Sequence, residues 1–380
     1  MTRPPAFSCI LTATTGEGPA ARRTIASLLA QERGDFELLI VDDGADAATR
    51  AALHGLRDRR IRHVRMSRAG RATARNRALR LAQGTWLIAL DPGDMLAGFA
   101  LAQLAAQADT AQCLFAPGVL RAPDGAARDG TGGGTGQGGT GQGSTGQYGA
   151  RSTPGQRIFD WAEARGLARG TGNNPHDRLA LAALALLPPT GPLRAVRRDY
   201  ALRHALCCAN GLSGGEVLFQ AGALLNLGEF ALVPLPLLAR DTGPVARRPV
   251  SGTGLTDVAG LTDTAPVDLT ADTAFDALGV AAQVLALFER ARHFFDPQVR
   301  LALMAGLARL LMQAEAALEP DRRDGLRNGI RLLALRSEPC LRRMLEPAQR
   351  AGPEAALGAL VPWITPVLDH VTPLWQAPTT

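Results

Sequence analysis

Short apolar runs alternate with amphipathic stretches over the first third of the chain. Residues 7–11, 36–41 and 86–90 form nearly continuous apolar runs, as is typical of strands that are buried on both faces of a sheet. A weaker strand is predicted at 61–66. Helices are predicted where apolar residues recur at three-and-four spacing, namely on the segment that carries Ile25, Leu28 and Leu29, at 47–56 and at 71–82. This alternation predicts an α/β fold with a mostly parallel, doubly wound sheet.

A stretch of very low complexity interrupts the chain after this α/β part. Residues 130–147 read GTGGGTGQGGTGQGSTGQ, which cannot bury apolar surface and is therefore predicted to be a flexible loop. The segment that follows is of mixed character, with a helix predicted near 214–227 and a strand near 230–235. A second Gly/Thr/Pro-rich segment predicts a linker at 251–266.

The remainder of the chain has the pattern of helices. The stretches FDALGVAAQVLALFERARHFF and PQVRLALMAGLARLLMQAEAAL carry apolar residues at helical spacing, and Asp296 followed by Pro297 forms a cap with proline in the first turn. Further helices are predicted at 321–336, 341–350 and 353–371. The chain is thus divided into an α/β part at 1–125, a loop at 126–156, a second part at 157–250, a linker at 251–266 and a helical region at 267–380.

The composition is that of a globular protein whose positive charge comes from arginine. Hydrophobic residues make up 46% and charged residues 20% of the 380 residues, the net charge is +6, and the sequence contains no lysine. Arginine keeps its charge at physiological pH, and its fork of donors suits phosphate and carboxylate groups. The charge fits an anionic substrate, a nucleic acid or an anionic membrane surface, and it equally fits a genome that favours arginine codons.

Several other features narrow the class of protein. The five cysteines have no metal-type spacing, which favours reduced thiols in a cytoplasm. The sequence has neither the apolar core of a signal peptide nor an apolar run of about 18 residues, so a cytoplasmic protein is predicted, with peripheral membrane association left open. The arginine-rich helix at 71–82 has no interleaved aromatic residues, which argues against a nucleic-acid partner.

Acidic residues follow two of the predicted strands. In an open parallel sheet, ligands bind beyond the carboxyl ends of the strands, where Asp42, Asp43 and Asp91 are expected. Because successive strand residues point to opposite faces, we expect Asp43 to face the cleft and Asp42 to be held by backbone or a neighbouring arginine. A type II turn over residues 91–94 would bring Asp91 and Asp94 together, either as a metal site or as an ordinary surface turn.

The ordered set of motifs resembles a known family. FSCILTATT, SLLAQERGDFELLIVDDG and GRATARNRALRLAQGTWLIALDPGD are similar, in order and spacing, to the nucleotide-sugar half of family-2 glycosyltransferases of the GT-A fold. This resemblance covers about residues 6–120. The stretches GPLRAVRRDYALRHAL and GGEVLFQAGALLNLGEFALVPLPLLAR are more loosely similar to the acceptor half of that family, up to about residue 250. The resemblance therefore implies a GT-A Rossmann-like sheet with flanking helices, and the all-α region predicted after it from the apolar pattern has no part in the resemblance.

The resemblance also implies roles for particular residues near a nucleotide-sugar donor. Thr12 and Asp43 would contact the nucleotide, and Arg75 would lie near the diphosphate. The acidic motif of the family reads Asp, any residue, Asp, Asp, and here it begins at Asp91. Gly93 stands where the family usually has its metal-binding carboxylate. The resemblance implies Mn²⁺ or Mg²⁺ held by Asp91 and Asp94, and Gly93 is expected to weaken the binding of this metal.

The reaction implied is inverting transfer of a hexose to a glycan or other surface-polysaccharide acceptor. Such a transfer needs a carboxylate base, which the family takes from a Glu-Asp pair; here Glu216 is followed by Val217. Glu216 is thus a candidate catalytic base or simply an acid favoured at a helix start. Arg240 occupies a position where the family often has a basic residue near the diphosphate, and a surface arginine is the alternative.

A second function remains open beside the enzyme. Gly93, Val217 and the low-complexity insertion favour a catalytically inactive GT-A-like protein that serves as a binding or scaffold partner. The sequence leaves the sugar, the nucleotide, the acceptor and the oligomeric state open.

Overall fold

The computed structural model describes residues 4–121, 175–241, 269–291 and 297–350, apart from 188, 190 and 191, together with 159, 166, 169 and 170. The predicted loop at 126–156, the linker at 251–266 and the helix at 353–371 lie outside these residues.

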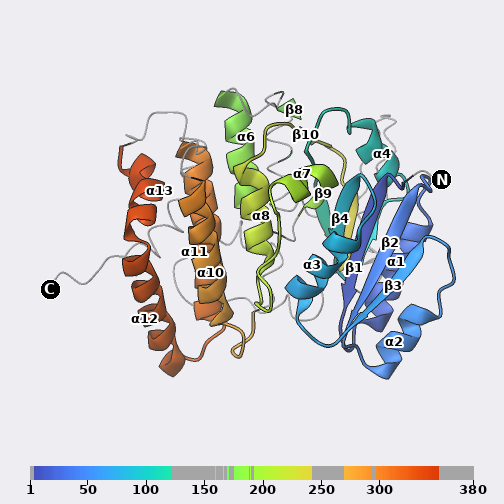
Figure 1. The fold of residues 1–380 in the computed structure, drawn as a ribbon, viewed down its shortest axis with the longest axis horizontal. Helices are drawn as coiled ribbons and strands as arrows, with labels where there is room; N and C mark the ends of the chain where they lie inside the picture. The colour runs from blue at the N-terminus through green and yellow to red at the C-terminus, as the bar shows by residue number, and fades with distance from the viewer. Residues whose placement is uncertain are drawn as a thin grey trace, which may run out of the picture.

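A mixed sheet of eight strands forms the centre of the described structure (Figure 1), in the order β3-β2-β1-β4-β9-β6-β10-β8. Strands β3, β2, β1 and β4 are parallel, β9 runs antiparallel between β4 and β6, and β8 is antiparallel to β10. The strands are β1 (Phe7–Ala13), β2 (Phe36–Asp43), β3 (Ile61–Met66), β4 (Trp86–Leu90), β6 (Cys113–Ala116), β8 (Arg169–Gly170), β9 (Leu193–Arg197) and β10 (Phe230–Leu232). The predicted mostly parallel sheet is confirmed.

The two faces of this sheet are covered by different helices. Cys9, Leu38 and Ile88 point toward α1 (Gly18–Leu29), α2 (Ala47–His54) and α4 (Ala100–Ala106). Their strand neighbours Ile10 and Leu39 point the other way, toward α3 (Arg71–Leu81). Both alternating sets are buried, which explains why β1, β2 and β4 are nearly continuous apolar runs in the sequence.

A small second sheet lies beside the carboxyl end of β4. It has the order β5-β11-β7, with β5 (Asp94–Leu96), β7 (Gly118–Arg121) and β11 (Leu238–Asp241). Strand β11 is antiparallel to β5, and their register places Arg240 opposite Asp94. This pairing joins residues that are far apart in the sequence directly at the acidic turn.

The helices of the later part extend the core away from the sheet. Figure 1 shows α6 and α8 between the sheet and a group formed by α10 to α13. The bounds are α6 (Pro175–Leu186), α7 (Arg198–Arg203), α8 (Glu216–Leu225), α10 (Asp276–Arg290), α11 (Pro297–Ala316), α12 (Pro320–Arg336) and α13 (Glu338–Arg350). One apolar cluster runs from the α3 face of the sheet through these helices, so the predicted helical region shares a core with the α/β part.

Two further observations concern membrane-spanning helices and disulfide bonds. No helix in the described ranges combines the length and the apolar character that crossing a membrane requires. All five cysteines are free thiols.

Candidate functional site

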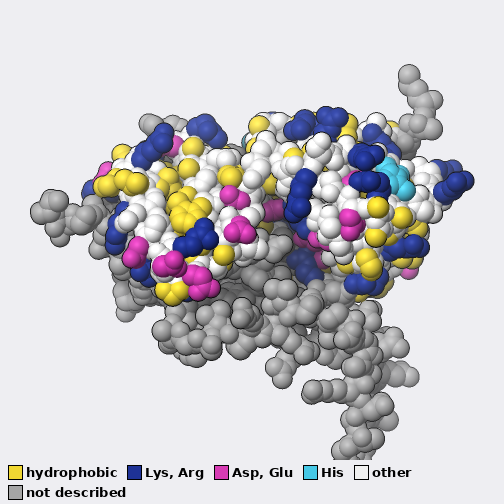
Figure 2. Space-filling view, turned by 90° about the horizontal axis from the view of Figure 1, so that it is seen from below, with side chains coloured by type: hydrophobic (Ala, Val, Ile, Leu, Met, Phe, Trp, Pro, Cys, Tyr) yellow, Lys and Arg dark blue, Asp and Glu magenta, His cyan; other side chains and the backbone are white. Residues whose placement is uncertain are grey.

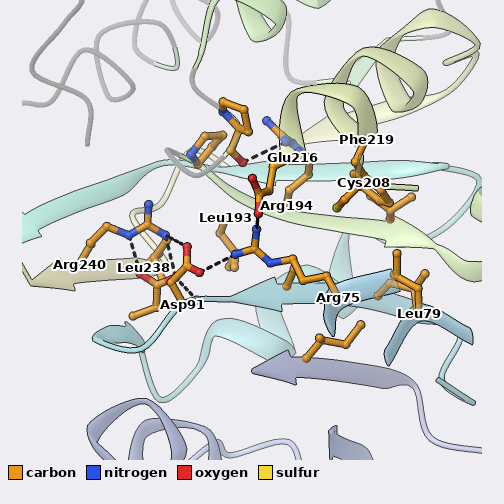
Figure 3. Close-up of a pocket in the computed structure, with 17 residues that line it drawn as sticks. Arg75, Leu79, Asp91, Leu193, Arg194, Cys208, Glu216, Phe219, Leu238 and Arg240 are labelled. Carbon is orange, nitrogen blue, oxygen red and sulfur yellow. Dashed lines mark hydrogen bonds and ion pairs between the residues drawn. The ribbon is translucent and has the colours of Figure 1, made fainter. Parts of the chain in front are cut away.

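A cavity of about 70 Å³ opens where the sheet, α3 and α8 meet (Figure 3). Its apolar lining includes Ile10 and Leu87 of the sheet, Phe219 of α8 and Leu238 of β11. Its polar lining consists of Arg75, Asp91, Asp94, Arg194, Glu216 and Arg240. Figure 2 shows arginine and acidic side chains gathered in a hollow between the helical side and the sheet side of the molecule. Of the residues predicted for the site, Arg75, Asp91, Asp94 and Glu216 are therefore brought together.

Arg75 is the centre of this polar lining. Its guanidinium donates through Nη1 to Oε1 of Glu216 and through Nη2 to Oδ1 of Asp91 (Figure 3). Arg75 is 5% exposed, and its Nε finds no partner among the described residues. One buried arginine thus joins the acidic turn after β4 to the start of α8.

Asn76, the neighbour of Arg75 on α3, fixes the segment that leads to Glu216. Its side-chain amide donates to the backbone carbonyl of Cys208 at 2.8 Å and accepts from the Cys208 amide at 2.8 Å. Both contacts are buried, and together they complete a backbone-like hydrogen-bond pair. The Arg-Asn pair of the motif therefore has two tasks, with the first residue in the cavity and the second holding its wall. The spacing of the motifs in the sequence alone did not identify Asn76 as a residue of the site.

The acidic turn has the predicted type II geometry. The Asp94 amide donates to the Asp91 carbonyl at 3.0 Å, and Gly93 has a φ of 98°, which only glycine adopts without strain at this position. In return, the Asp91 amide donates to Oδ2 of Asp94 at 2.9 Å, and the Gly93 amide donates to Oγ1 of Thr24 at 2.9 Å. Asp94 is only 1% exposed, so the alternative of an ordinary surface turn is wrong.

Arg240 closes the acidic turn from the other side. Its Nε donates to Oδ1 of Asp94 at 2.6 Å, and its Nη2 donates to Oδ2 at 2.7 Å, which is a bidentate pair. The side chain of Arg240 is 15% exposed. Its place near the acidic motif agrees with the family resemblance, and the alternative of a surface arginine is wrong.

The arginines determine the charge state of Asp91. Burial opposes ionisation of this carboxyl, but the charges of Arg75, Arg71 and Arg240 outweigh it and lower the pKa of Asp91 to about 2. Arg71 lies 3.3 Å from Oδ1 of Asp91 and forms a second ion pair with Glu17 at 2.6 Å. Asp91 is therefore ionised at neutral pH within a shell of guanidinium groups.

The donor set does not fit the divalent cation that the family resemblance implies. Both carboxylate oxygens of Asp94 accept from Arg240, and Oδ1 of Asp91 accepts from Arg71 and Arg75. Mn²⁺ and Mg²⁺ bind through such oxygens, and a guanidinium beside them cannot lose its charge to make room. Within the described ranges, no group of three or more His, Cys, Asp or Glu side chains could hold a metal ion.

Thr12 and Asp43 lie at the same sheet edge but do not line the cavity. Asp43 is fully buried, and its Oδ1 accepts from the Ala69 amide at 2.7 Å, because the backbone before α3 folds over it. Oδ2 of Asp43 and Oγ1 of Thr12 are buried without a partner among the described residues. Asp42 points the other way and pairs with Arg50 at 3.1 Å. Asp42 and Asp43 thus point to opposite sides, as predicted, but Asp43 is buried and is not directly accessible to a ligand in this structure.

Arg194 is the cavity residue that sequence reasoning missed. It lies on β9, where its Nη1 donates to the Pro189 carbonyl at 3.2 Å and its guanidinium stands 5.6 Å from the Phe115 ring centroid. Its Nε and Nη2 are buried without a hydrogen-bond partner in the described part of the chain. Burial lowers the pKa of Arg194 to about 10, which leaves it protonated at neutral pH. An arginine in the apolar run LRAV was the available signal.

Comparison with known proteins agrees with the motifs. Residues 9–132 match the family model described as glycosyl transferase family 2. Over 90 residues, the chain is 36% identical to the succinoglycan biosynthesis protein ExoO of Rhizobium meliloti, a match that covers 23% of this chain and 26% of that protein. The chain thus spans about a quarter of the length of this curated relative.

Two solved structures have a similar course of the chain. TarS residues 1–349 of S. aureus in complex with UDP-GlcNAc give a TM-score of 0.48 at 13% identity, with 90% of this chain and 91% of that chain covered. The mannosyltransferase PcManGT of Pyrobaculum calidifontis in complex with GDP-Man and Mn²⁺ gives a TM-score of 0.42 at 17% identity, with 98% and 85% covered.

Proposed function

We propose that this chain, whose residues 9–132 match the model of glycosyl transferase family 2, transfers a sugar from a nucleotide-sugar donor to a glycan or other surface-polysaccharide acceptor. The observation that supports the proposal is the convergence of Arg75, Asp91 and Glu216 on one cavity from α3, the end of β4 and the start of α8. The site lies beyond the carboxyl end of a parallel strand, where open α/β sheets bind their ligands.

Glu216 is our candidate for the general base of an inverting transfer. Its side chain is 17% exposed, lies on the cavity wall and forms an ion pair with Arg75. An ionised carboxylate can take the proton from an acceptor hydroxyl while the oxygen of that hydroxyl attacks the anomeric carbon. Arg75 then orients the base and joins it to the acidic turn that faces the donor.

A second candidate function is a binding or scaffold protein without catalysis. The observation that favours it is that Asp91, Asp94 and Glu216 are all held in ion pairs with arginines. Such a network of ion pairs would maintain the fold of the family without presenting a free carboxylate to a substrate. Turnover separates the two candidates.

The decisive experiment measures release of nucleoside diphosphate from a panel of UDP- and GDP-sugars, with Mn²⁺ and with EDTA, for the full chain and two variants. Glu216→Gln keeps an acceptor for Arg75 but cannot take a proton, so we expect the rate to fall by about 10² to 10⁴ with little change in melting temperature. Glu338→Gln, on the exposed face of α13, is the control and keeps the rate. Full activity of Glu216→Gln would remove the base assignment, and no turnover of any donor would favour the scaffold.

A further inference from the structure

The acidic motif is occupied by arginine. Oδ1 of Asp91 accepts from Arg71 and Arg75, and both carboxylate oxygens of Asp94 accept from Arg240. These are oxygens through which a divalent cation binds, and the remaining one, Oδ2 of Asp91, lies 3.9 Å from Nη2 of Arg240. Arginine side chains of α3 and β11 therefore already supply the positive charge that a cation would bring.

This arrangement resists entry of a metal. Guanidinium groups stay protonated at any physiological pH, so a cation that approached Asp91 or Asp94 would meet fixed positive charges at ion-pair distance. The low dielectric of a buried site strengthens that repulsion. Asp94 is 1% exposed and tied through a bidentate pair, so binding a metal there would require Arg240 to leave.

Arg194 provides a positive charge that no carboxylate balances within the described structure. Its Nε and Nη2 are buried and have no hydrogen-bond partner there, although Arg194 lines the same cavity as Arg75 and Arg240. A buried cation without a counter-ion is unfavourable, and an anion that enters the cavity would satisfy both its charge and its free donors. Phosphate matches the fork geometry of a guanidinium.

Resting on the proposed glycosyltransferase function, we propose that this site binds the diphosphate of the donor without a divalent cation. Arg194 is the group that binds the phosphate oxygens, and Arg75 and Arg240 occupy the acidic motif in place of the metal. The nucleoside diphosphate that leaves after transfer would be held by the same guanidinium groups, which carry their charge before, during and after the reaction.

The test is titration calorimetry of the full chain with UDP and with GDP, in EDTA and in excess Mn²⁺. At least one nucleotide is expected to bind in EDTA, with a Kd within about threefold of that in Mn²⁺. Arg194→Gln should weaken this binding by about 10- to 100-fold in both buffers, since a hydrogen-bonded charge is lost. Arg194→Lys, which keeps the charge but not the fork, should fall between the two.

Controls keep the experiment interpretable. Arg203→Gln removes one arginine charge from an exposed position on α7 and should bind as the unchanged protein does. Arg194→Gln removes a buried charge without leaving a carboxylate unpaired, so its melting temperature should not fall. If that variant nevertheless unfolds, the comparison of EDTA with Mn²⁺ on the unchanged protein still decides the question of the metal.

The possible outcomes separate this inference from the proposed function. Binding that requires Mn²⁺, equal binding by Arg194→Gln, or no binding of either nucleotide would overturn the inference. Transfer that proceeds only with Mn²⁺ would overturn the inference and leave the glycosyltransferase intact. Binding in EDTA that is sensitive to Arg194, with no donor turned over, would support the inference and remove the catalytic function.

Discussion

The pair between Arg240 and Asp94 gives a prediction that can be worked out from the structure. Asp94 is 1% exposed. After replacement of Arg240 with Gln, the Asp91 amide is the remaining donor to the Asp94 carboxylate in the turn. Two charge-assisted hydrogen bonds, at 2.6 and 2.7 Å, are lost. A buried charge left without its partner costs about 3–5 kcal/mol, and we expect the free energy of unfolding to fall by that amount.

The double variant Asp94→Asn with Arg240→Gln should be much milder. Both charges are gone, and the side-chain oxygen of the introduced asparagine can still accept from the Asp91 amide, so we expect a loss below about 1.5 kcal/mol. A double-mutant cycle on urea unfolding, completed with Asp94→Asn alone, then gives a coupling energy of about 2–4 kcal/mol. The exposed pair of Arg342 with Glu338 is the matched control, and Arg342→Gln should cost less than about 0.5 kcal/mol.

The cycle can refute the account of the acidic turn. If Arg240→Gln cost less than about 1 kcal/mol, Asp94 would have to be hydrated or protonated rather than paired, and its oxygens would be available to a metal. A coupling energy near zero would have the same meaning. In either case the arginine occupancy of the motif, and with it the metal-free site, would lose its basis.

Three further predictions test the fold of the sheet and of the helices that pack on it. Burial of Glu37 favours its neutral form, but hydrogen bonds from Ser8, the Gln83 amide and Arg62 outweigh burial and hold the pKa of Glu37 below its ordinary 4.5. The stabilisation that these bonds give the folded protein is complete above about pH 4.5 and is lost as the pH falls through the lowered pKa. The melting-temperature advantage over Glu37→Gln should therefore shrink in acid, and a constant difference would contradict the pairing. Gly84→Ala places a Cβ 2.6 Å from the backbone of Phe7 and should lower the free energy of unfolding by about 1–3 kcal/mol in urea titration; an unchanged midpoint would contradict the close approach. Tyr200→Phe removes a buried 2.7 Å hydrogen bond to the Ala223 carbonyl and should cost about 1–3 kcal/mol, whereas a neutral result would show that the carbonyl finds another donor.

The elements that could be predicted from the sequence are those with an unambiguous apolar pattern. Strands β1 and β2 are buried along their whole length and β4 is buried except at Ala89, and all three appear as nearly continuous apolar runs. Strand β9 was missed because arginines interrupt its run, although it joins β4 to β6 in the middle of the sheet. The helix α6 was missed for the opposite reason, since its residues 180–186 are buried throughout and leave no polar stripe to reveal a helical period.

Most charged residues of the site were predictable from the sequence, Arg194 being the exception, but their pairings were not. The order of motifs placed Arg75, Asp91 and Asp94 together, and the turn residues predicted the geometry of the acidic turn. The partner of Asp94 depends on the register between β5 and β11, which no local pattern specifies. Asp43 was expected to face the cleft, but the Ala69 amide takes its oxygen, because the backbone before α3 is drawn over the end of β2.

The helices beyond the family match contribute to the geometry of the site. The loop before Glu216 is held on one side by Asn76 of α3 and on the other by α10, where Asp276 accepts from the Ser213 amide at 3.0 Å. Gly279 of α10 leaves room for Leu212, because a Cβ there would come within 2.8 Å of the leucine. The position of Glu216 relative to Arg75 therefore depends on packing against α10.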